Sequence, residues 1–525
     1  MAFLPQYLFC RGRKLDHLIA FICGCIFLVF GYNQGVMSGI LTMPSFLDAF
    51  PLIDPDAGTL YSDRSARSTY QGLAVASYNL GCFLGAVVTI FIGNLLGRKR
   101  VLFLGTLTML LGAALQASAT TLPHFIVGRI ITGIGNGLNT STVPTWQSEL
   151  TKPHKRGKMV LMDGALITCG IMISYWVDFG LSFASRSIAW RLPIALQCVL
   201  CIPVLYLLPS MPESPRWLIF KSRNDAAEEV LIALYHDDVD RAELVESEYH
   251  AIQGTVAEMS KGKFSDLFTM DKNRNLHRTL LGYWIQVFQQ LSGINLITFY
   301  AAVIYSNLGM SGFMSRLLAA VNGTEYFLAS IPAMFLVERV GRRKLLLFGT
   351  IGQAVTMAIL ASVNSRTETG FQITGIVFLF VFNTFFALGW LGTSWLYPAE
   401  IVPLRIRAPA NALSTSANWI FNFIVVMITP IAFNSIGYKT YVIFAVINAF
   451  IVPCVYFLYP ETAGRTLEEM DSIFHKVHGW EGAFTVVKKA RTEPKWSELS
   501  REALVEPRDV ERQSRRSTAS RRRSL

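Results

Sequence analysis

Apolar runs of about 20 residues recur along this 525-residue chain, and they constrain its fold more than any other feature. An α-helix rises about 1.5 Å per residue, so a run of this length can cross the ~30 Å hydrocarbon core of a bilayer. The chain is 52% hydrophobic and only 16% charged, whereas ordinary soluble domains carry about 25% charged residues. The sequence therefore predicts a protein that spans a membrane many times.

About twelve such runs are present, six in each half of the chain, and each is expected to form one spanning helix. The runs of the first half are residues 18–40, 70–92, 101–119, 123–146, 158–181 and 191–210. The runs of the second half are residues 279–306, 317–337, 345–362, 372–397, 409–433 and 438–459. We predict an all-α membrane protein made of two six-helix bundles.

Polar segments complete the expected domain organisation. Residues 211–278 form a polar insert whose helical pattern favours a small cytoplasmic bundle of amphipathic helices. The predicted units are an N-terminus at 1–17, a first bundle at 18–210, the insert at 211–278, a second bundle at 279–459 and a tail at 460–525. The tail loses its apolar periodicity and ends in arginine-rich sequence, so we expect disorder from about residue 480.

Charged motifs recur at nearly constant spacing in the two halves. The segment Gly97–Thr106 (GRKRVLFLGT) is repeated, with changes, as Gly341–Thr350 (GRRKLLLFGT), 244 residues later. Two further pairs lie 251 and 248 residues apart: Glu149 and Arg156 with Glu400 and Arg407, and Pro212-Glu213-Ser214 with Pro460-Glu461-Thr462. Two similar halves with charges at matching depths are typical of transporters that rock one half against the other.

The distribution of basic residues predicts the orientation of the chain. Arginine and lysine are concentrated in the loops at 98–100, 152–158, 342–344 and 405–407, whereas the alternate loops carry mostly acids and single basic residues. Loops rich in positive charge face the cytoplasm. Both termini are then cytoplasmic, and we expect a multi-pass protein of the plasma membrane.

Several classes of function are disfavoured. The net charge of +11 does not indicate nucleic acid, because the basic residues lie between apolar runs and in the tail. Seven of the eight cysteines lie inside apolar runs, so we expect neither a disulfide framework nor a metal site. We find no GxSxG, Walker A or HExxH motif, and we expect no enzymatic activity and no cofactor.

Three motifs resemble signatures of the sugar porter family of the major facilitator superfamily. They are Pro212–Leu218 (PESPRWL), Gln289–Asn295 (QQLSGIN) and Pro460–Glu469 (PETAGRTLEE). The set Gly31–Gly35 (GYNQG), Gly389-Trp390 and Trp395–Glu400 (WLYPAE) is most similar to fungal hexose and polyol transporters. The resemblance covers about residues 18–475 and implies two six-helix bundles, a central sugar site and alternating access.

The seventh apolar run has the chemistry that such a site requires. Its neutral polar side chains include Gln286, Gln289, Gln290, Asn295 and Tyr300. Removing a sugar from water requires groups that replace the hydrogen bonds of its hydroxyls, and amides both donate and accept. Gln289 and Asn295 would point roughly 120° apart on a straight helix. We therefore expect the helix to break at Ser292-Gly293, as transporter helices do beside a midplane site; alternatively, the amides only join helices.

The resemblance also assigns individual roles. It implies that Gln289, Gln290 and Asn295 bind the sugar, that Trp395 stacks on it, and that Asn418 and Asn422 reach it from the eleventh run. Three positions depart from the family pattern: Gly164 replaces an amide in the fifth run, Tyr326 replaces an asparagine in the eighth, and Gly389-Trp390-Leu391-Gly392 replaces a proline-rich break in the tenth. The expected substrate is a glucose-like hexose, with a pentose, polyol or sugar acid as alternatives.

Coupling to protons depends on three positions. In proton symporters of the family, an aspartate of the first helix pairs with an arginine of the fourth; here Arg129 is present, but Asn33 replaces the acid. Asparagine does not titrate, which favours facilitated diffusion. The alternative is a proton symporter that uses Asp163, because an acid inside an apolar run is usually functional or paired unless it faces water. A second alternative is a sugar sensor that does not transport.

The repeated charges form a predicted cytoplasmic gate. Its residues are Arg98, Glu149, Arg156, Glu213, Arg342, Glu400, Arg407 and Glu461. We expect salt bridges between the two halves across the cytoplasmic mouth. Exposed pairs contribute only about 0–1 kcal/mol each, but a network can bias an equilibrium between two conformations. In the alternative interpretation these charges only set the topology.

Overall fold

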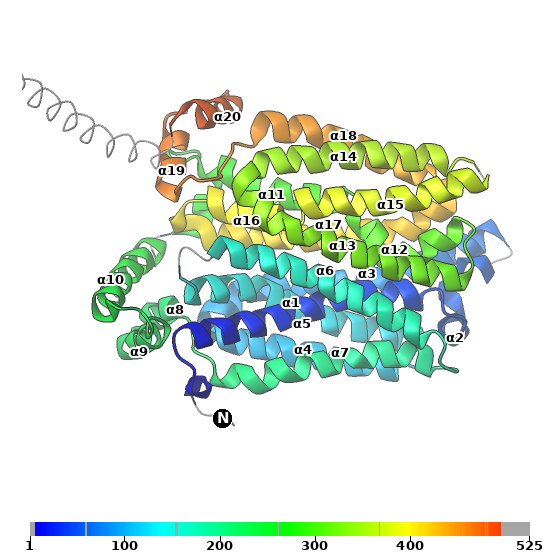
Figure 1. The fold of residues 1–525 in the computed structure, drawn as a ribbon, viewed down its shortest axis with the longest axis horizontal. Coiled ribbons are helices and arrows are strands. Elements are labelled where there is room, and N and C mark those ends of the chain that lie inside the picture. Colours follow the sequence, from blue (N-terminus) through cyan, green and yellow to red (C-terminus); the bar gives the residue numbers. More distant parts are fainter. Residues whose placement is uncertain are drawn as a thin grey trace, which may run out of the picture.

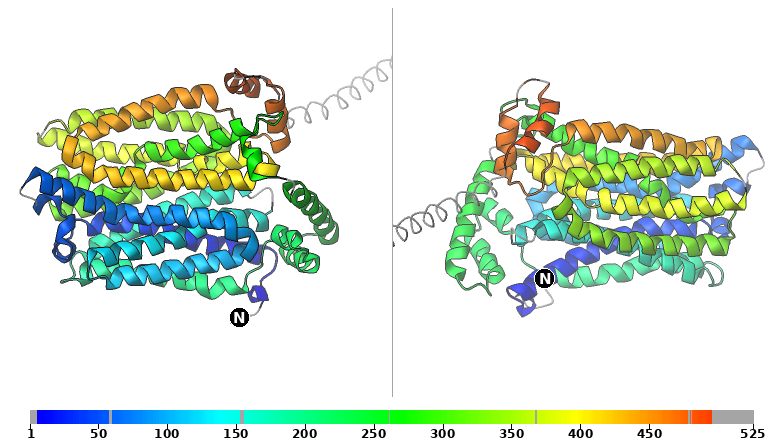
Figure 2. Two further views of the ribbon diagram at one scale, coloured as in Figure 1. Left: turned by 180° about the vertical axis from the view of Figure 1, so that it is seen from behind. Right: turned by 45° about the horizontal axis from the view of Figure 1, so that its top comes forward.

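The structure, a computed structural model, describes residues 6–57, 60–152, 156–260, 262–366, 368–477, 479 and 481–494. Long helices run side by side in two layers, one from each half of the chain, and the short helices of the insert and of the C-terminal segment gather at one end (Figure 1). Figure 2 shows the same two layers from behind, with the insert again at one end of both. The predicted all-α membrane fold is confirmed.

The first half supplies six long helices and a short one. The long helices are α1 (Arg13–Ile40), α3 (Tyr61–Leu96), α4 (Arg98–Ser118), α5 (Leu122–Leu150), α6 (Arg156–Leu181) and α7 (Ile188–Leu207). The short helix α2 (Pro44–Ala49) follows α1 at the end away from the insert.

The second half also supplies six spans, two of which are interrupted. The continuous helices are α13 (Gly312–Val340), α14 (Arg342–Val363), α17 (Arg407–Ile436) and α18 (Lys439–Leu458). The interrupted spans consist of α11 (Asn275–Leu291) with α12 (Ile294–Asn307), and α15 (Thr369–Gly389) with α16 (Thr393–Ile401). The two halves meet where α1 and α6 pack on α12 and α13, and where α3 packs on α17.

Eleven helical stretches among the described residues are long and apolar enough to cross a membrane. The twelfth expected span, residues 123–146, lies within α5, which packs along both α3 and α4. This helix is more polar because its inward face carries glycines and buried polar residues such as Arg129 and Asn136. A Cβ atom on Gly133 would lie only 2.1 Å from the carbonyl oxygen of Tyr78. Glycine is therefore required for α3 and α5 to approach this closely.

The insert forms three helices, α8 (Pro215–Phe220), α9 (Asn224–Leu234) and α10 (Arg241–Ser260), at one end of the molecule. It contacts both halves. Lys152 of the α5–α6 loop pairs with Asp238 at 2.5 Å, and Arg405 of the second half pairs with Asp266 at 2.8 Å. The backbone N–H of Lys263 holds the pKa of the Asp266 carboxyl below its usual value. The insert is thus attached to each bundle by a separate ion pair.

The C-terminal segment adds α19 (Leu467–His475) and α20 (Gly482–Thr492) at the same end. Disorder was expected from about residue 480, but residues 482–492 are helical. The reason is an apolar stripe of Val486, Val487 and Ala490, all of which are buried. Residues 495–525, which include the arginine-rich sequence, lie outside the described part of the chain.

Candidate functional site

The seventh span breaks at the predicted place. Helix α11 ends at Leu291, and α12 begins at Ile294 after Gly293, which adopts a left-handed backbone with φ of 97°. A side chain at Gly293 would meet Phe444 at 2.9 Å and Met357 at 3.0 Å. The carbonyl of Ser292, freed by the break, accepts a hydrogen bond of 2.9 Å from Asn448. The break is thus packed and hydrogen-bonded from the neighbouring helices.

This break brings the predicted amides together. Asn295 donates a hydrogen bond to Gln290, and Gln290 donates to Oε1 of Gln289 at 3.3 Å. Asn418 of α17 donates from Nδ2 to Oε1 of Gln289 at 2.9 Å and to Oε1 of Gln286 at 2.7 Å. All five side chains are buried. They form one continuous network of neutral donors and acceptors, which we call the amide network.

The second interrupted span faces the amide network. Gln286 donates to the carbonyl of Ser394 at 2.8 Å, and Gln289 donates to the carbonyl of Trp390 at 3.4 Å. The indole of Trp390 is buried and donates to Oγ1 of Thr350 at 3.0 Å. Sequence reasoning noted the altered motif here but missed this role of Trp390 and Ser394. The contacts join residues about 100 positions apart, so no local pattern reveals them.

The remaining predicted site residues lie on helices around the network. Asn422, one turn beyond Asn418 on α17, is buried, and its Oδ1 has no hydrogen-bond partner among the described residues. Tyr326 of α13 is buried against Phe386, with ring centroids 6.3 Å apart. Trp395 of α16 is half-buried. Of these three, Asn422 offers a polar atom that a bound ligand would satisfy.

The three coupling positions are separate in the structure. Asn33 is buried on α1 and donates to the carbonyl of Val29 on its own helix at 2.9 Å. Arg129 donates to the carbonyl of Val75 at 2.9 Å and lies over the ring of Tyr78 at 5.1 Å. Within the described residues, no hydrogen bond joins Asn33 to Arg129.

Asp163 of α6 is 3% exposed, so it does not face water. Its contact is a hydrogen bond of 3.4 Å from the amide of Gln147, and no described cation forms an ion pair with it. The adjacent Gly164 packs against Leu391 and Gly392, at the break between α15 and α16. The residue that follows Asp163 therefore packs on the segment whose carbonyls face the amide network, whereas the Asp163 side chain contacts Gln147 of α5.

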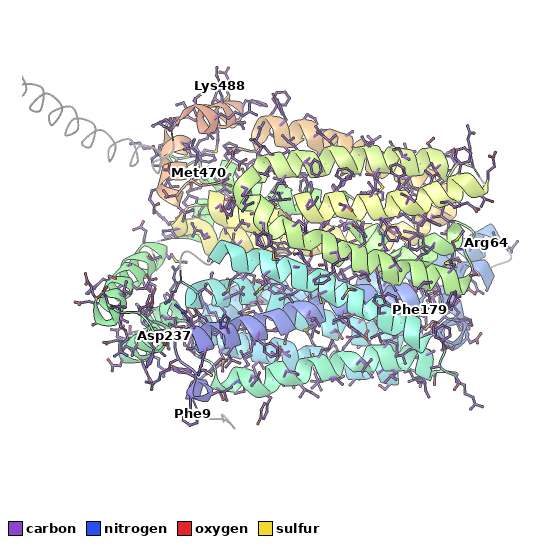
Figure 3. The ribbon with its side chains drawn as sticks, viewed as in Figure 1. Phe9, Arg64, Phe179, Asp237, Met470 and Lys488 are labelled. Atoms are coloured by element: carbon purple, nitrogen blue, oxygen red, sulfur yellow. The ribbon has the colours of Figure 1, made fainter. Side chains whose placement is uncertain are left out.

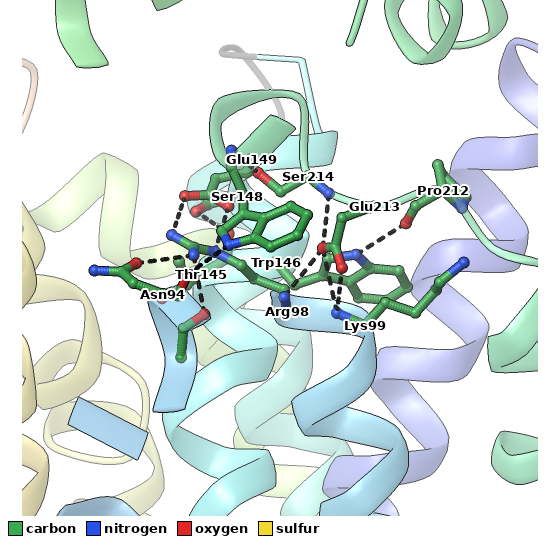
Figure 4. A network of polar contacts seen from close by, with 12 residues as sticks. Asn94, Arg98, Lys99, Thr145, Trp146, Ser148, Glu149, Pro212, Glu213 and Ser214 are labelled. Carbon is green, nitrogen blue, oxygen red and sulfur yellow. Dashed lines mark hydrogen bonds and ion pairs between the residues drawn. The ribbon is translucent and has the colours of Figure 1, made fainter. Parts of the chain in front are cut away.

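The repeated charges of the first half form a network within that half (Figure 4). Arg98 donates to Glu149 from Nε at 3.1 Å and from Nη2 at 3.3 Å. Glu213 accepts the backbone N–H of Arg98 at 3.0 Å, at the start of α4. Burial raises the pKa of the Glu213 carboxyl, against the opposing effect of the backbone N–H groups of Ser214 and Lys99.

The second half repeats this network. Arg342 donates to Glu400 from Nη2 at 2.7 Å and from Nε at 3.2 Å, and Glu461 accepts its backbone N–H at 2.8 Å. The expected bridges across the mouth are therefore wrong for Arg98, Glu149, Glu213, Arg342, Glu400 and Glu461, which pair within their own halves. The physical reason is that Glu213 and Glu461 accept the backbone N–H groups that begin α4 and α14, and Glu149 and Glu400 accept from the side chain of the first arginine of the same helix. Arg407 donates to the carbonyl of Val402 at 3.1 Å, and the side chain of Arg156 lies outside the described part.

Two layers of membrane-length helices, equivalent in their charged motifs, with interrupted spans lined by polar groups, define a transporter of the major facilitator type. Residues 17–474 match the family described as "Sugar (and other) transporter". The chain belongs to this family of sugar transporters. The match covers both bundles and the insert, and it ends within α19.

Named relatives agree with this assignment. "Sugar transporter STL1" of Saccharomyces cerevisiae is 39% identical over 89% of this chain and 82% of its own length. "Major facilitator superfamily transporter mfsA" of Aspergillus fumigatus is 38% identical over 89% of this chain and 87% of its own length. "High glucose sensor RGT2" of S. cerevisiae is 31% identical over 90% of this chain and 62% of its own length.

Solved structures share the fold. The proton:xylose symporter XylE bound to 6-bromo-6-deoxy-D-glucose superposes with a TM-score of 0.74 and 24% identity, covering 87% of this chain and 99% of XylE. An inward-open form of XylE from E. coli gives a TM-score of 0.71. At this identity the likeness concerns the arrangement of helices alone.

Proposed function

We propose that this sugar transporter moves a glucose-like hexose by alternating access, with the amide network as its binding site. The observation that carries the proposal is the convergence of Gln286, Gln289, Gln290, Asn295 and Asn418 at two helix breaks. Neutral amides replace the water around sugar hydroxyls without favouring any ion. The network is already satisfied internally, so an entering sugar exchanges amide–amide bonds for amide–hydroxyl bonds.

The contacts between the halves support alternating access. The proposed location in the plasma membrane, with both termini cytoplasmic, is supported by the positively charged loops instead. Toward the end away from the insert, Arg316 donates to the carbonyl of Thr42 at 3.2 Å, and Ser38 accepts the N–H of Ala302 at 3.1 Å. Toward the insert, Leu161 of the first half packs with Leu396 of the second. Either set of contacts can open while the other stays closed, because each charged network remains inside its own half.

We further propose that transport is coupled to a proton carried by Asp163. Burying an acid in a membrane without a described cationic partner costs free energy, and such an acid is usually functional. Its position beside the α15–α16 break would link protonation to the segment that contacts the amide network. The second candidate, facilitated diffusion, is favoured by Asn33, which cannot exchange a proton at the usual position of the family.

Uptake of labelled sugars tests the binding site. Cells that lack their own hexose uptake should grow on glucose when they express the chain, whereas a sensor that does not transport would leave them starved. The triple variant Gln289→Ala/Gln290→Ala/Asn295→Ala should lower glucose uptake by roughly 10- to 2,000-fold at equal surface abundance, because each of three lost hydrogen bonds contributes about 0.5–1.5 kcal/mol.

The matched control is Gln372→Ala, which removes one amide from the first turn of α15, at the end of the molecule away from the insert. It should leave uptake within a factor of two of the unaltered protein. Uptake that persists in the triple variant would refute the proposed site. A parallel screen of pentoses, polyols and sugar acids then identifies the preferred substrate.

A further inference from the structure

Helix α20 extends the lipid-facing surface of the second half. Phe484 of α20 contacts Phe457 at the end of α18, with ring centroids 6.4 Å apart, and the two residues are 58% and 51% exposed. The apolar surface continues along α18 through Val446 and Phe450. Figure 1 shows α20 beside this end of α18, at the end of the molecule that carries the insert. In a cytoplasmic orientation, α20 lies at the boundary between acyl chains and headgroups.

Basic side chains follow on the same exposed face of α20. Lys488 and Arg491 lie four and seven residues beyond Phe484, so the three side chains share one side of the helix. Lys488 projects from the top of the molecule in Figure 3. The guanidinium of Arg491 lies over the ring of Tyr456 at 5.8 Å, and that of Arg343 lies over the same ring at 5.0 Å.

Lys488 and Arg491 have no described acidic partner: among residues 6–494, outside the gaps in the description, no carboxylate forms an ion pair with either side chain. Arg343 is 5% exposed, its Nη2 donates to the carbonyl of Tyr456 at 2.6 Å, and Glu461 accepts its backbone N–H at 3.2 Å. Two arginines on one tyrosine repel each other, and this arrangement is stabilised when an anion lies between or beside them. Tyr456 is 46% exposed, so such an anion can approach from the lipid side.

The helix that presents these groups is firmly held. Arg465 donates from Nη2 to the carbonyl of Ala490 at 2.9 Å and to that of Glu493 at 2.6 Å. Val486 and Val487 on the opposite face are buried. The basic face is therefore displayed by a docked helix rather than by a loose end.

We propose that Tyr456, Lys488 and Arg491 bind the headgroup of an anionic phospholipid of the cytoplasmic leaflet, with its acyl chains against Phe457 and Phe484, and that the buried Arg343 adds positive charge beside Tyr456. Guanidinium groups bind phosphate oxygens through paired N–H donors, and aromatic rings such as Tyr456 favour the headgroup level. The aromatic part of the site requires acyl chains, so the ligand is a lipid and not a free phosphate ion.

Native mass spectrometry of the full-length, detergent-purified protein tests this proposal. The protein is titrated with phosphatidylserine or phosphatidylcholine, and the number of bound lipids is counted. Each basic side chain near an anionic lipid changes binding by roughly fivefold, so Lys488→Gln/Arg491→Gln should weaken phosphatidylserine binding about 30-fold and leave phosphatidylcholine binding unchanged. Phe484→Ala, which keeps every charge, should also weaken retention of phosphatidylserine.

The matched control is Lys221→Gln/Arg241→Gln, which removes the same charge from exposed positions of the insert. It should bind phosphatidylserine like the unaltered protein. The proposal is overturned if Lys488→Gln/Arg491→Gln binds normally, if the control loses binding equally, or if excess inorganic phosphate displaces the lipid. These readouts require no transport and are independent of the proposed substrate.

Discussion

At the scale of single residues, Asn33 and Asp163 are the observations behind the two proposals for how transport is driven. Asn33 is at the position where the resemblance to the sugar porter family implies an acid in symporters, and it is bonded to its own helix. Asp163 is 3% exposed and accepts one long hydrogen bond from Gln147. Sequence reasoning identified Asp163 but left open whether it faces water; its burial answers that question, and the proposed proton coupling rests on it.

Proton coupling predicts a measurable pH change. Adding glucose to an unbuffered suspension of cells that express the chain should cause transient alkalinisation, and uptake should increase as the external pH is lowered. Asp163→Asn can still accept the hydrogen bond from the Gln147 amide, but it has no carboxyl group to bind and release a proton. It should therefore abolish the alkalinisation and the pH dependence. Glu325→Gln, on α13, is the control, because its carboxyl is bonded to Thr384 at 2.5 Å, away from Asp163. Sugar uptake without any pH change in the unaltered protein would instead support facilitated diffusion.

At the scale of helices, the two interrupted spans create the site. Gly293 has φ of 97°, and a side chain there would contact Phe444 at 2.9 Å. Gly293→Ala should destabilise the protein by about 1–2 kcal/mol from backbone strain alone and lower sugar uptake by displacing Asn295. Gly180→Ala, in a helix and with no atom within 4 Å of the added carbon, should change neither. Thermal unfolding of the purified proteins and uptake measure both effects, and equal stability of the two variants would contradict the argument.

The sequence predicts these elements to different degrees. Apolar runs predict the spanning helices because the thickness of the bilayer determines how long each run must be. Ser292-Gly293 predicts the break in the seventh span. The amides were predicted to converge, yet their contacts with Trp390 and Ser394 depend on a second break about 100 residues away. Helix α20 was missed because its buried stripe has only three residues and is surrounded by polar sequence.

At the scale of the whole molecule, the internal repeat places equivalent charges in both halves, but the sequence does not show which charges pair. The structure pairs Arg98 with Glu149 and Arg342 with Glu400. The halves differ at one equivalent position. Arg342 has a second carboxylate, Glu338, at 2.8 Å, whereas Arg98 has the neutral amide of Asn94 at 3.1 Å. Asn94 and Glu338 are separated by 244 residues, the spacing of the repeat itself.

This asymmetry predicts that the two halves respond unequally to the loss of the equivalent acid. Glu149→Gln removes the carboxylate that pairs with Arg98, and it should cost about 1–3 kcal/mol of stability because a largely buried charge loses its partner. Glu400→Gln should cost less, since Glu338 continues to neutralise Arg342. Adding Asn94→Glu to Glu149→Gln supplies the missing acid at the matching position and should restore most of the lost stability and uptake. Thermal unfolding and surface abundance measure the order of the three variants. Equal losses in the two single variants, or no rescue by Asn94→Glu, would mean that these networks do not hold each half together.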